Sequence, residues 1–242
     1  MLSLKEKFEA PLPKWLHDIE IEAYSKISTA PFALECYGGD AIAVAKQMLG
    51  LWPFVDKFPE MIVSGCRSLV SLKLLWRFGV SDLYTLYQKS SKILRSISSD
   101  EEEHRKLWLD TSDTLGLKYP TDFYRETLPE TRDWIDAVNQ RTDSYRMFAG
   151  FTAIEIIAEA ISKYLLISDA FNKTLGKRGS RWFKAHVHPD DYAGATHEEL
   201  AWRLAFAFYP ATPSKESCNG IVQDIVDLFL KAADASRYIK LP

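Results

Sequence analysis

Hydrophobic residues recur along this chain with the period of an α-helix, and no segment alternates as a strand between hairpin turns would. Glycine and proline interrupt the pattern and divide it into helical stretches. The ranges predicted as helices are 14–28, 40–50, 53–64, 66–78, 80–97, 100–115, 130–142, 144–166, 168–187, 197–209 and 216–238. Pro53 and Pro129 are expected in first turns, where a missing N–H costs nothing. The pattern predicts an all-α protein.

The composition is that of one ordinary globular unit. The chain has 242 residues, of which 47% are hydrophobic and 26% charged, and no linker, repeat or low-complexity tract divides it. We therefore expect residues 1–242 to form a single helical domain. A net charge of −3 without a basic stripe argues against a nucleic-acid partner.

The location of the protein is also a prediction from sequence. Charged residues stand near the N-terminus where a signal peptide needs an apolar core, and no run approaches the ~18 apolar residues of a membrane span. Cys36, Cys66 and Cys218 are odd in number and far apart. These features favour a cytoplasmic, reduced protein with no membrane partner.

The first candidate for metal chemistry is a Glu-x-x-His pair. Glu101 and His104 are three residues apart, so both side chains face the same side of a helix. The same spacing occurs in di-iron carboxylate bundles. The alternative is a solvated acidic first turn that complements the helix dipole.

The second candidate is an acid on an apolar helix. Glu155 stands among Phe148, Phe151, Ile154, Ile156, Ile157 and Ile161, which predicts burial on nearly all sides. A buried carboxylate requires a cation or a proton. An ion pair with Lys163 accounts for Glu159 but leaves Glu155 unexplained.

The third candidate segment contains three histidines. His186 and Asp190 are four residues apart, and on one regular helix His197 would lie about 20° around the axis from His186. His188 would lie about 160° away from His186. Pro189 either begins or kinks a helix here. A polar surface loop is the alternative interpretation.

In combination, these segments resemble the haem-oxygenase-like non-haem di-iron oxidases. Three segments match the family pattern: Glu101–His104, Ala153-Ile154-Glu155, and the run from Trp182 through His186 to Asp190. Upstream of them, residues 50–58 also resemble a stretch of the family. The family's last motif, His-x-x-x-Asp-x-x-His, ends here at Ala193. His197 is the candidate replacement, with His188 or water as alternatives.

The resemblance implies a haem-oxygenase-like helical bundle that binds two Fe(II) ions and uses O₂ as co-substrate. Its implied metal ligands are Glu101, His104, Glu155, His186, Asp190 and His197. Family members cleave fatty acids to terminal alkenes, fragment amino acids, or rearrange tryptophan into a nitrile. The resemblance thus implies oxidation of a small carboxylate substrate in specialised metabolism.

The substrate is less well specified. Aromatic residues near the predicted ligands, namely Phe54, Phe58, Trp76, Phe148, Phe151 and Phe183, favour an amino acid, tryptophan-like among the options, over a fatty acid, although aromatic residues are more often plain core. Arg146 and Lys184 are candidates for binding its carboxylate. The apolar face of the C-terminal helix fits the interior of one subunit or the contact between two, so a homodimer stays open.

Three other functions make different demands on the sequence. A thiaminase-type hydrolase of the same fold would need a nucleophilic cysteine in the middle of the chain, and none lies between Cys66 and Cys218. A haem oxygenase would need an early proximal histidine such as His17, which we interpret as a surface residue beside Asp18 and Glu20. A non-enzymatic helical scaffold would leave all the acid–histidine clusters in solvent.

Overall fold

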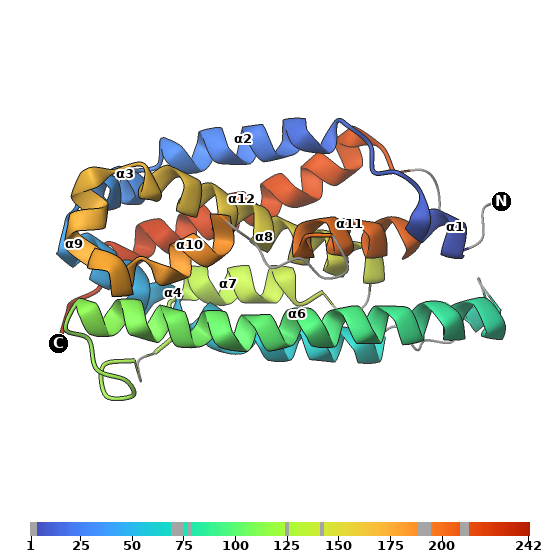
Figure 1. The fold of residues 1–242 in the computed structure, drawn as a ribbon, viewed down its shortest axis with the longest axis horizontal. Coiled ribbons are helices and arrows are strands. Elements are labelled where there is room, and N and C mark those ends of the chain that lie inside the picture. Colours follow the sequence, from blue (N-terminus) through green and yellow to red (C-terminus); the bar gives the residue numbers. More distant parts are fainter. Residues whose placement is uncertain are drawn as a thin grey trace.

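The computed structural model describes residues 4–68, 75–76, 79–123, 126–140, 143–187, 195–208 and 213–242. These residues form helices and connecting turns, and no strand occurs among them, so the all-α prediction is confirmed (Figure 1). The helices are α1 (Leu4–Glu9), α2 (Leu16–Ser28), α3 (Pro31–Tyr37), α4 (Ala41–Ser68), α6 (Val80–Thr114), α7 (Pro129–Val138), α8 (Ser144–Leu166), α9 (Asp169–Gly179), α10 (Arg181–Val187), α11 (His197–Phe208) and α12 (Lys215–Ser236).

Two long helices replace pairs of shorter ones that the sequence predicts. The predicted helices 40–50 and 53–64 are continuous in α4, and Pro53 lies inside this helix rather than in a first turn. The predicted break between 97 and 100 is also wrong, because α6 continues through it. The Ser98 hydroxyl donates to the carbonyl of Pro59 on α4 at 3.0 Å, so it does not cap a new helix. Pro129 does begin α7, as predicted.

The central element is α8, which is buried on nearly all sides and contacts most of the other helices. In Figure 1, α4 and α6 lie side by side along one edge and α2 lies along the opposite edge, while α12 runs between them and contacts α4, α7 and α8. One connected hydrophobic core joins these elements. An acidic residue on the inner part of α8 is therefore placed in the middle of the molecule.

The predicted helix 168–187 is two helices. Gly176 has a φ of 64°, a left-handed conformation that favours glycine, and α9 ends at Gly179 before α10 begins at Arg181. The short helices α1 and α3 were not predicted. Within the described residues, no helix is both long enough and apolar enough to cross a membrane.

Candidate metal centre

The Glu-x-x-His pair is on the middle of α6 and is turned toward the core. Nδ1 of His104 lies 3.2 Å from Oε1 of Glu101, and each side chain is nearly 90% buried. The pair shares a face because three residues span nearly one helical turn. The solvated-face alternative is therefore wrong for Glu101 and His104, whereas their neighbour Glu103 is exposed and paired with Lys106.

Helix α10 brings His186 against this pair. The ring centroids of His186 and His104 are 4.3 Å apart. Nδ1 of His186 lies 2.8 Å from the carbonyl oxygen of Trp182, one turn earlier. Because a carbonyl accepts only from N–H, Nδ1 carries the proton and Nε2 keeps its lone pair for a ligand.

Helices α8 and α11 supply the second half of the centre. Glu155 on α8 is 15% exposed at its side chain, and Nδ1 of His197 lies 4.0 Å from its Oε1. Nε2 of His197 is 3.0 Å from Oδ2 of Asp100 on α6. With Asp100 holding the Nε2 proton, the lone pair of Nδ1 faces Glu155.

Two groups of donor atoms result, and they share one residue. Glu101, His104 and His186 form the first group, and Glu101, Glu155 and His197 form the second, with the ligand atoms of each group within 4.8 Å of one another. The first group has two imidazoles and one carboxylate, and the second has two carboxylates and one imidazole. Both sets of donors suit divalent iron. The ion pairs of Glu101 and Glu155 within the described residues are with histidines rather than with lysine or arginine. These buried carboxylates therefore fit a cation.

Burial and charged neighbours shift the pKa values of these groups. Burial opposes ionisation of Glu101, but the charge and hydrogen bond of His104, together with the charges of His186 and His197, outweigh burial and hold the pKa of Glu101 below its usual value. Burial lowers the pKa of His104, but the charge and hydrogen bond of Glu101, together with the charges of Glu155 and Asp100, outweigh burial and raise this pKa to about 9. Burial and the charge of Glu101 raise the pKa of Glu155 to about 8. Burial and His104 lower the pKa of His186 to about 4.

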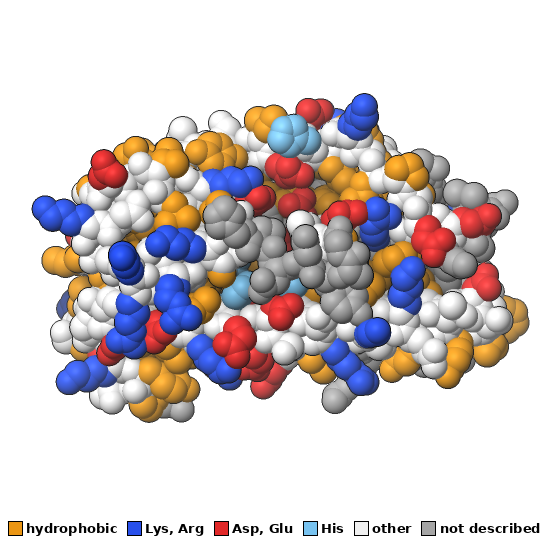
Figure 2. Space-filling model, viewed as in Figure 1, with side chains coloured by type: hydrophobic (Ala, Val, Ile, Leu, Met, Phe, Trp, Pro, Cys, Tyr) orange, Lys and Arg blue, Asp and Glu red, His pale blue; other side chains and the backbone are white. Residues whose placement is uncertain are grey.

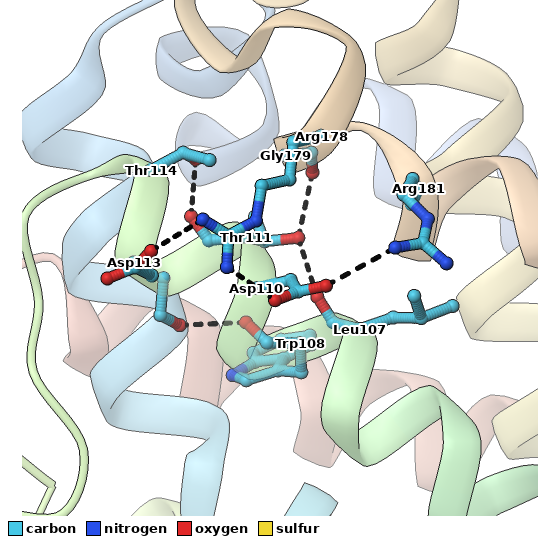
Figure 3. Close-up of polar contacts among 10 residues, drawn as sticks. Leu107, Trp108, Asp110, Thr111, Asp113, Thr114, Arg178, Gly179 and Arg181 are labelled. Atoms are coloured by element: carbon cyan, nitrogen blue, oxygen red, sulfur yellow. Dashed lines mark hydrogen bonds and ion pairs between the residues drawn. The ribbon is translucent and has the colours of Figure 1, made fainter.

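A polar network at one end of α6 fixes the position of α10 (Figure 3). Arg178 at the end of α9 binds Asp110 and Asp113 of α6 at 2.7 and 2.8 Å. The Thr111 hydroxyl donates to the carbonyl of Gly179 at 2.7 Å. Arg181 in the first turn of α10 reaches Asp110 at 3.4 Å. These contacts attach the start of α10 to α6, and His186 lies on the last turn of the same short helix.

A narrow apolar cavity begins at the centre and runs into the core. Glu101, Glu155 and His186 are among its lining residues, and the stretch of α4 from Val44 to Phe58 forms one wall. The cavity extends along this stretch, which is about 20 Å long. Because its volume is only about 80 Å³, the cavity is slender. Figure 2 shows histidine side chains close to acidic ones near the middle of the face drawn. A second hollow is lined by residues that include His104, His186 and His197.

The structure places most of the predicted ligands together. Glu101, His104, Glu155, His186 and His197 meet, whereas Asp190 and its neighbour His188 lie outside the described residues. The predicted ranges 168–187 and 197–209 are confirmed in that α10 ends at Val187 and α11 begins at His197, so the angle between His186 and His197 on one regular helix does not apply. His197 reaches the centre from the start of a separate helix.

The structure also tests the predictions for the aromatic residues, the two basic residues and His17. Phe54, Phe58 and Phe183 line the cavity, but Trp76 is 90% exposed. Arg146 and Lys184 are exposed and line neither hollow, so they do not serve as a carboxylate clamp. His17 is a surface residue paired with Glu20, as predicted.

Sequence reasoning missed Asp100, the partner of His197, and Gln47, a polar residue on the cavity wall. Asp100 belongs to a run of four acidic residues, 100–103, and the sequence alone does not indicate which of them contacts a histidine. Gln47 could have been noticed as an uncharged polar residue within the apolar run 41–51.

Comparison with known proteins supports the fold and not a family. No protein-family model matches the chain, and no curated protein matches it in sequence. A TenA homologue from Pseudomonas syringae pv. tomato aligns with 97% of this chain and 98% of its own, with a TM-score of 0.70 and 14% identity. A domain of unknown function with a haem-oxygenase-like fold from Shewanella denitrificans aligns with 94% of this chain and 92% of its own, with a TM-score of 0.68 and 15% identity. The chain thus has the predicted haem-oxygenase-like all-α fold.

Proposed function

We propose that this protein is a non-haem di-iron, O₂-dependent oxidase. The observation that carries the proposal is the sharing of Glu101 by two buried groups of donor atoms. A shared carboxylate between two such groups is the arrangement that places two metal ions side by side. The fold alone does not distinguish this function, since proteins of one fold carry out different reactions.

The ligands would be divided between two iron ions. Glu101, His104 and His186 would hold one iron, and Glu101, Glu155 and His197 the other, with Asp190 a candidate for either. Iron held there in the ferrous state would supply the electrons for O₂ activation. The protein orients the ligands through the Trp182 carbonyl and Asp100, and the apolar cavity excludes water from the reacting part of the substrate.

The cavity also limits the substrate. Among its described lining residues there is no lysine or arginine. The acid group of a carboxylate substrate would therefore find its positive charge at the metals and nowhere else along the wall. The slender apolar space fits either a flat amino-acid side chain or an alkyl chain. We propose a small amino acid, with a tryptophan-like one among the candidates, and oxidative decarboxylation of a fatty acid as the alternative.

A hydrolase with a cysteine nucleophile receives no support from the described thiols. Burial raises the pKa of Cys36 to about 12 and that of Cys218 to about 11, so neither forms a thiolate near neutral pH. The side chain of Cys66 is outside the described part.

The test is O₂ consumption by iron-loaded protein in the presence of candidate acids. Protein loaded anaerobically with Fe(II) would be mixed with O₂ and with tryptophan, phenylalanine or a fatty acid, and the products identified by mass spectrometry. The proposal predicts that O₂ uptake is accelerated by one class of acid and that this acid is converted. Iron-loaded protein that consumes no O₂ with any class, or consumes it without converting the acid, would contradict the proposal.

A further inference from the structure

One oxidisable side chain of the cavity wall lies directly against a predicted metal ligand. The indole of Trp182 on α10 contacts the ring of His186 one turn later, and the two ring centroids are 4.1 Å apart. Trp182 is 8% exposed and is among the residues that line the apolar cavity. A metal bound to His186 lies about 2 Å from the imidazole nitrogen, so a single imidazole ring separates it from the indole.

The other indoles of the described wall are farther from the predicted ligands. Trp108 contacts Trp182 edge-on at 4.9 Å, and thus lies behind it as seen from His186. Trp134 stacks on Phe54 at 3.8 Å, and its described ring contacts do not include a histidine. No tyrosine is among the described lining residues. Trp182 is therefore the described electron-rich ring of the cavity that adjoins the proposed metal centre.

The indole of Trp182 is not needed to orient His186. Nδ1 of His186 donates to the main-chain carbonyl of Trp182 at 2.8 Å, and any residue at this position supplies that carbonyl. What the side chain adds is a large π-system that is readily oxidised. When the cavity holds no substrate, this ring is in the position of an alternative target for oxidation.

We propose that Trp182 is a modification site of the oxidase: when bound Fe(II) reacts with O₂ and no substrate occupies the cavity, the indole is hydroxylated. A ring C–H bond becomes C–OH with one oxygen atom of O₂, and the other oxygen atom leaves as water with two protons from the solvent. O₂ gains four electrons, two from the two Fe(II) ions and two from the C–H bond. This inference rests on the proposed function, because it requires both iron ions.

The experiment locates the added oxygen by peptide mass spectrometry. The natural protein is loaded anaerobically with Fe(II), its iron content is determined, and it is exposed to ¹⁸O₂ without any added acid. We expect the peptide that contains Trp182 to gain the mass of one ¹⁸O atom. The peptide that contains Trp76 should gain none. Trp76 is 90% exposed, so it reports any oxidant that diffuses through the solution.

Controls show whether the metal centre is the source of the oxidation. Zn²⁺-loaded protein should gain no oxygen at Trp182, because Zn²⁺ has no redox chemistry and supplies no electrons. Glu155→Ala, which is expected to lose one metal ion, should lose most of the gain at Trp182. The matched variant Glu159→Ala should keep it, because Glu159 pairs with Lys163 and is not a predicted ligand.

Three results would overturn the modification of Trp182 and leave the proposed oxidase untouched. They are bound Fe(II) that O₂ does not oxidise without an acid, oxidation of the bound Fe(II) with Trp182 unchanged, and an equal gain of oxygen at Trp182 and Trp76. An equal gain in the Zn²⁺-loaded protein would also overturn the assignment to the metal centre. A natural protein that binds no iron would overturn the proposed function and this inference together, and the iron analysis of the same sample distinguishes that failure from the others.

Discussion

Glu155 shows most directly how a single residue links the sequence to the site. It lies on a helix that is apolar on nearly all sides, its side chain is only 15% exposed, and its described ionic partner is a histidine 4.0 Å away. One turn later, Glu159 pairs with Lys163 and is about twice as exposed. The two acids share a helix but differ in what satisfies their charge.

We predict that Glu155→Ala removes one metal ion per chain and iron-dependent activity, while the helical fold is kept. Loss of a ligand should weaken the second group of donors by roughly 100-fold or more. Metal content and circular dichroism would be compared with Glu159→Ala, which should bind metal normally. Normal metal content in Glu155→Ala would contradict the ligand assignment.

The raised pKa values of Glu155 and His104 predict the pH dependence of metal binding. Both groups hold a proton near neutral pH in the metal-free protein, with pKa values of about 8 and about 9, and both must lose it to coordinate a metal. Affinity should therefore rise as pH increases from 6 toward 8, by about tenfold per pH unit for each proton released.

Calorimetry of Zn²⁺ binding in buffers of different ionisation enthalpy would count these protons. Glu155→Gln should release about one proton fewer than the natural protein. An affinity that is independent of pH over this range, with no proton release, would show that the two groups are not ligands.

At the scale of elements, the position of α10 decides whether His186 reaches His104. Gly179 packs so closely on α6 that a β-carbon there would lie 2.5 Å from Oγ1 of Thr114 and 3.1 Å from Cβ of Leu175. The carbonyl of Gly179 also accepts from Thr111. The junction between α9 and α10 is thus held by close backbone packing as well as by ion pairs.

We predict that Gly179→Ala lowers the free energy of unfolding by about 1–3 kcal/mol, because the added methyl group must push α9 away from α6. It should also weaken the first metal site, which contains His186. The control is Gly220→Ala on α12, where a β-carbon meets nothing within 4 Å and should stabilise the helix by up to about 1 kcal/mol. Thermal unfolding with and without metal measures both effects, and a Gly179→Ala protein as stable as the control would refute this packing argument.

Local sequence patterns were insufficient to predict where α4 and α6 begin and end. The serines and the acid of 98–100 are typical of a helix start, but α6 runs through them because the Ser98 hydroxyl bonds to α4 and Asp100 to His197. Pro53 lies inside α4, which packs along α6 despite the hydrogen bond that proline cannot make. In each case a tertiary contact overrides a local signal, and such contacts are not visible in sequence periodicity.

For the whole molecule, the fold and most of the site were accessible from the sequence. Glu101 and His104 were identified because their spacing has a direct meaning on a helix, and Glu155 because its neighbours are apolar. The role of Asp100 and the cavity wall depend on helices far apart in sequence, so no local pattern indicates them. His197 was selected for a helical geometry that does not exist, yet it lies 4.0 Å from Glu155.

Comparison at the level of the whole chain confirms the haem-oxygenase-like architecture at 14% and 15% identity. Chemistry therefore has to be argued from the side chains rather than from the fold. The central claim is that two buried groups of donors, joined by Glu101, hold two iron ions.

The most direct test is an anaerobic titration of the metal-free protein with Fe(II), followed by iron analysis after gel filtration. The account predicts two Fe(II) per chain in the natural protein and one in His197→Ala, which keeps the group formed by Glu101, His104 and His186. No bound iron in the natural protein with the helical fold intact, or two tightly bound ions in His197→Ala, would contradict the proposed two-iron centre.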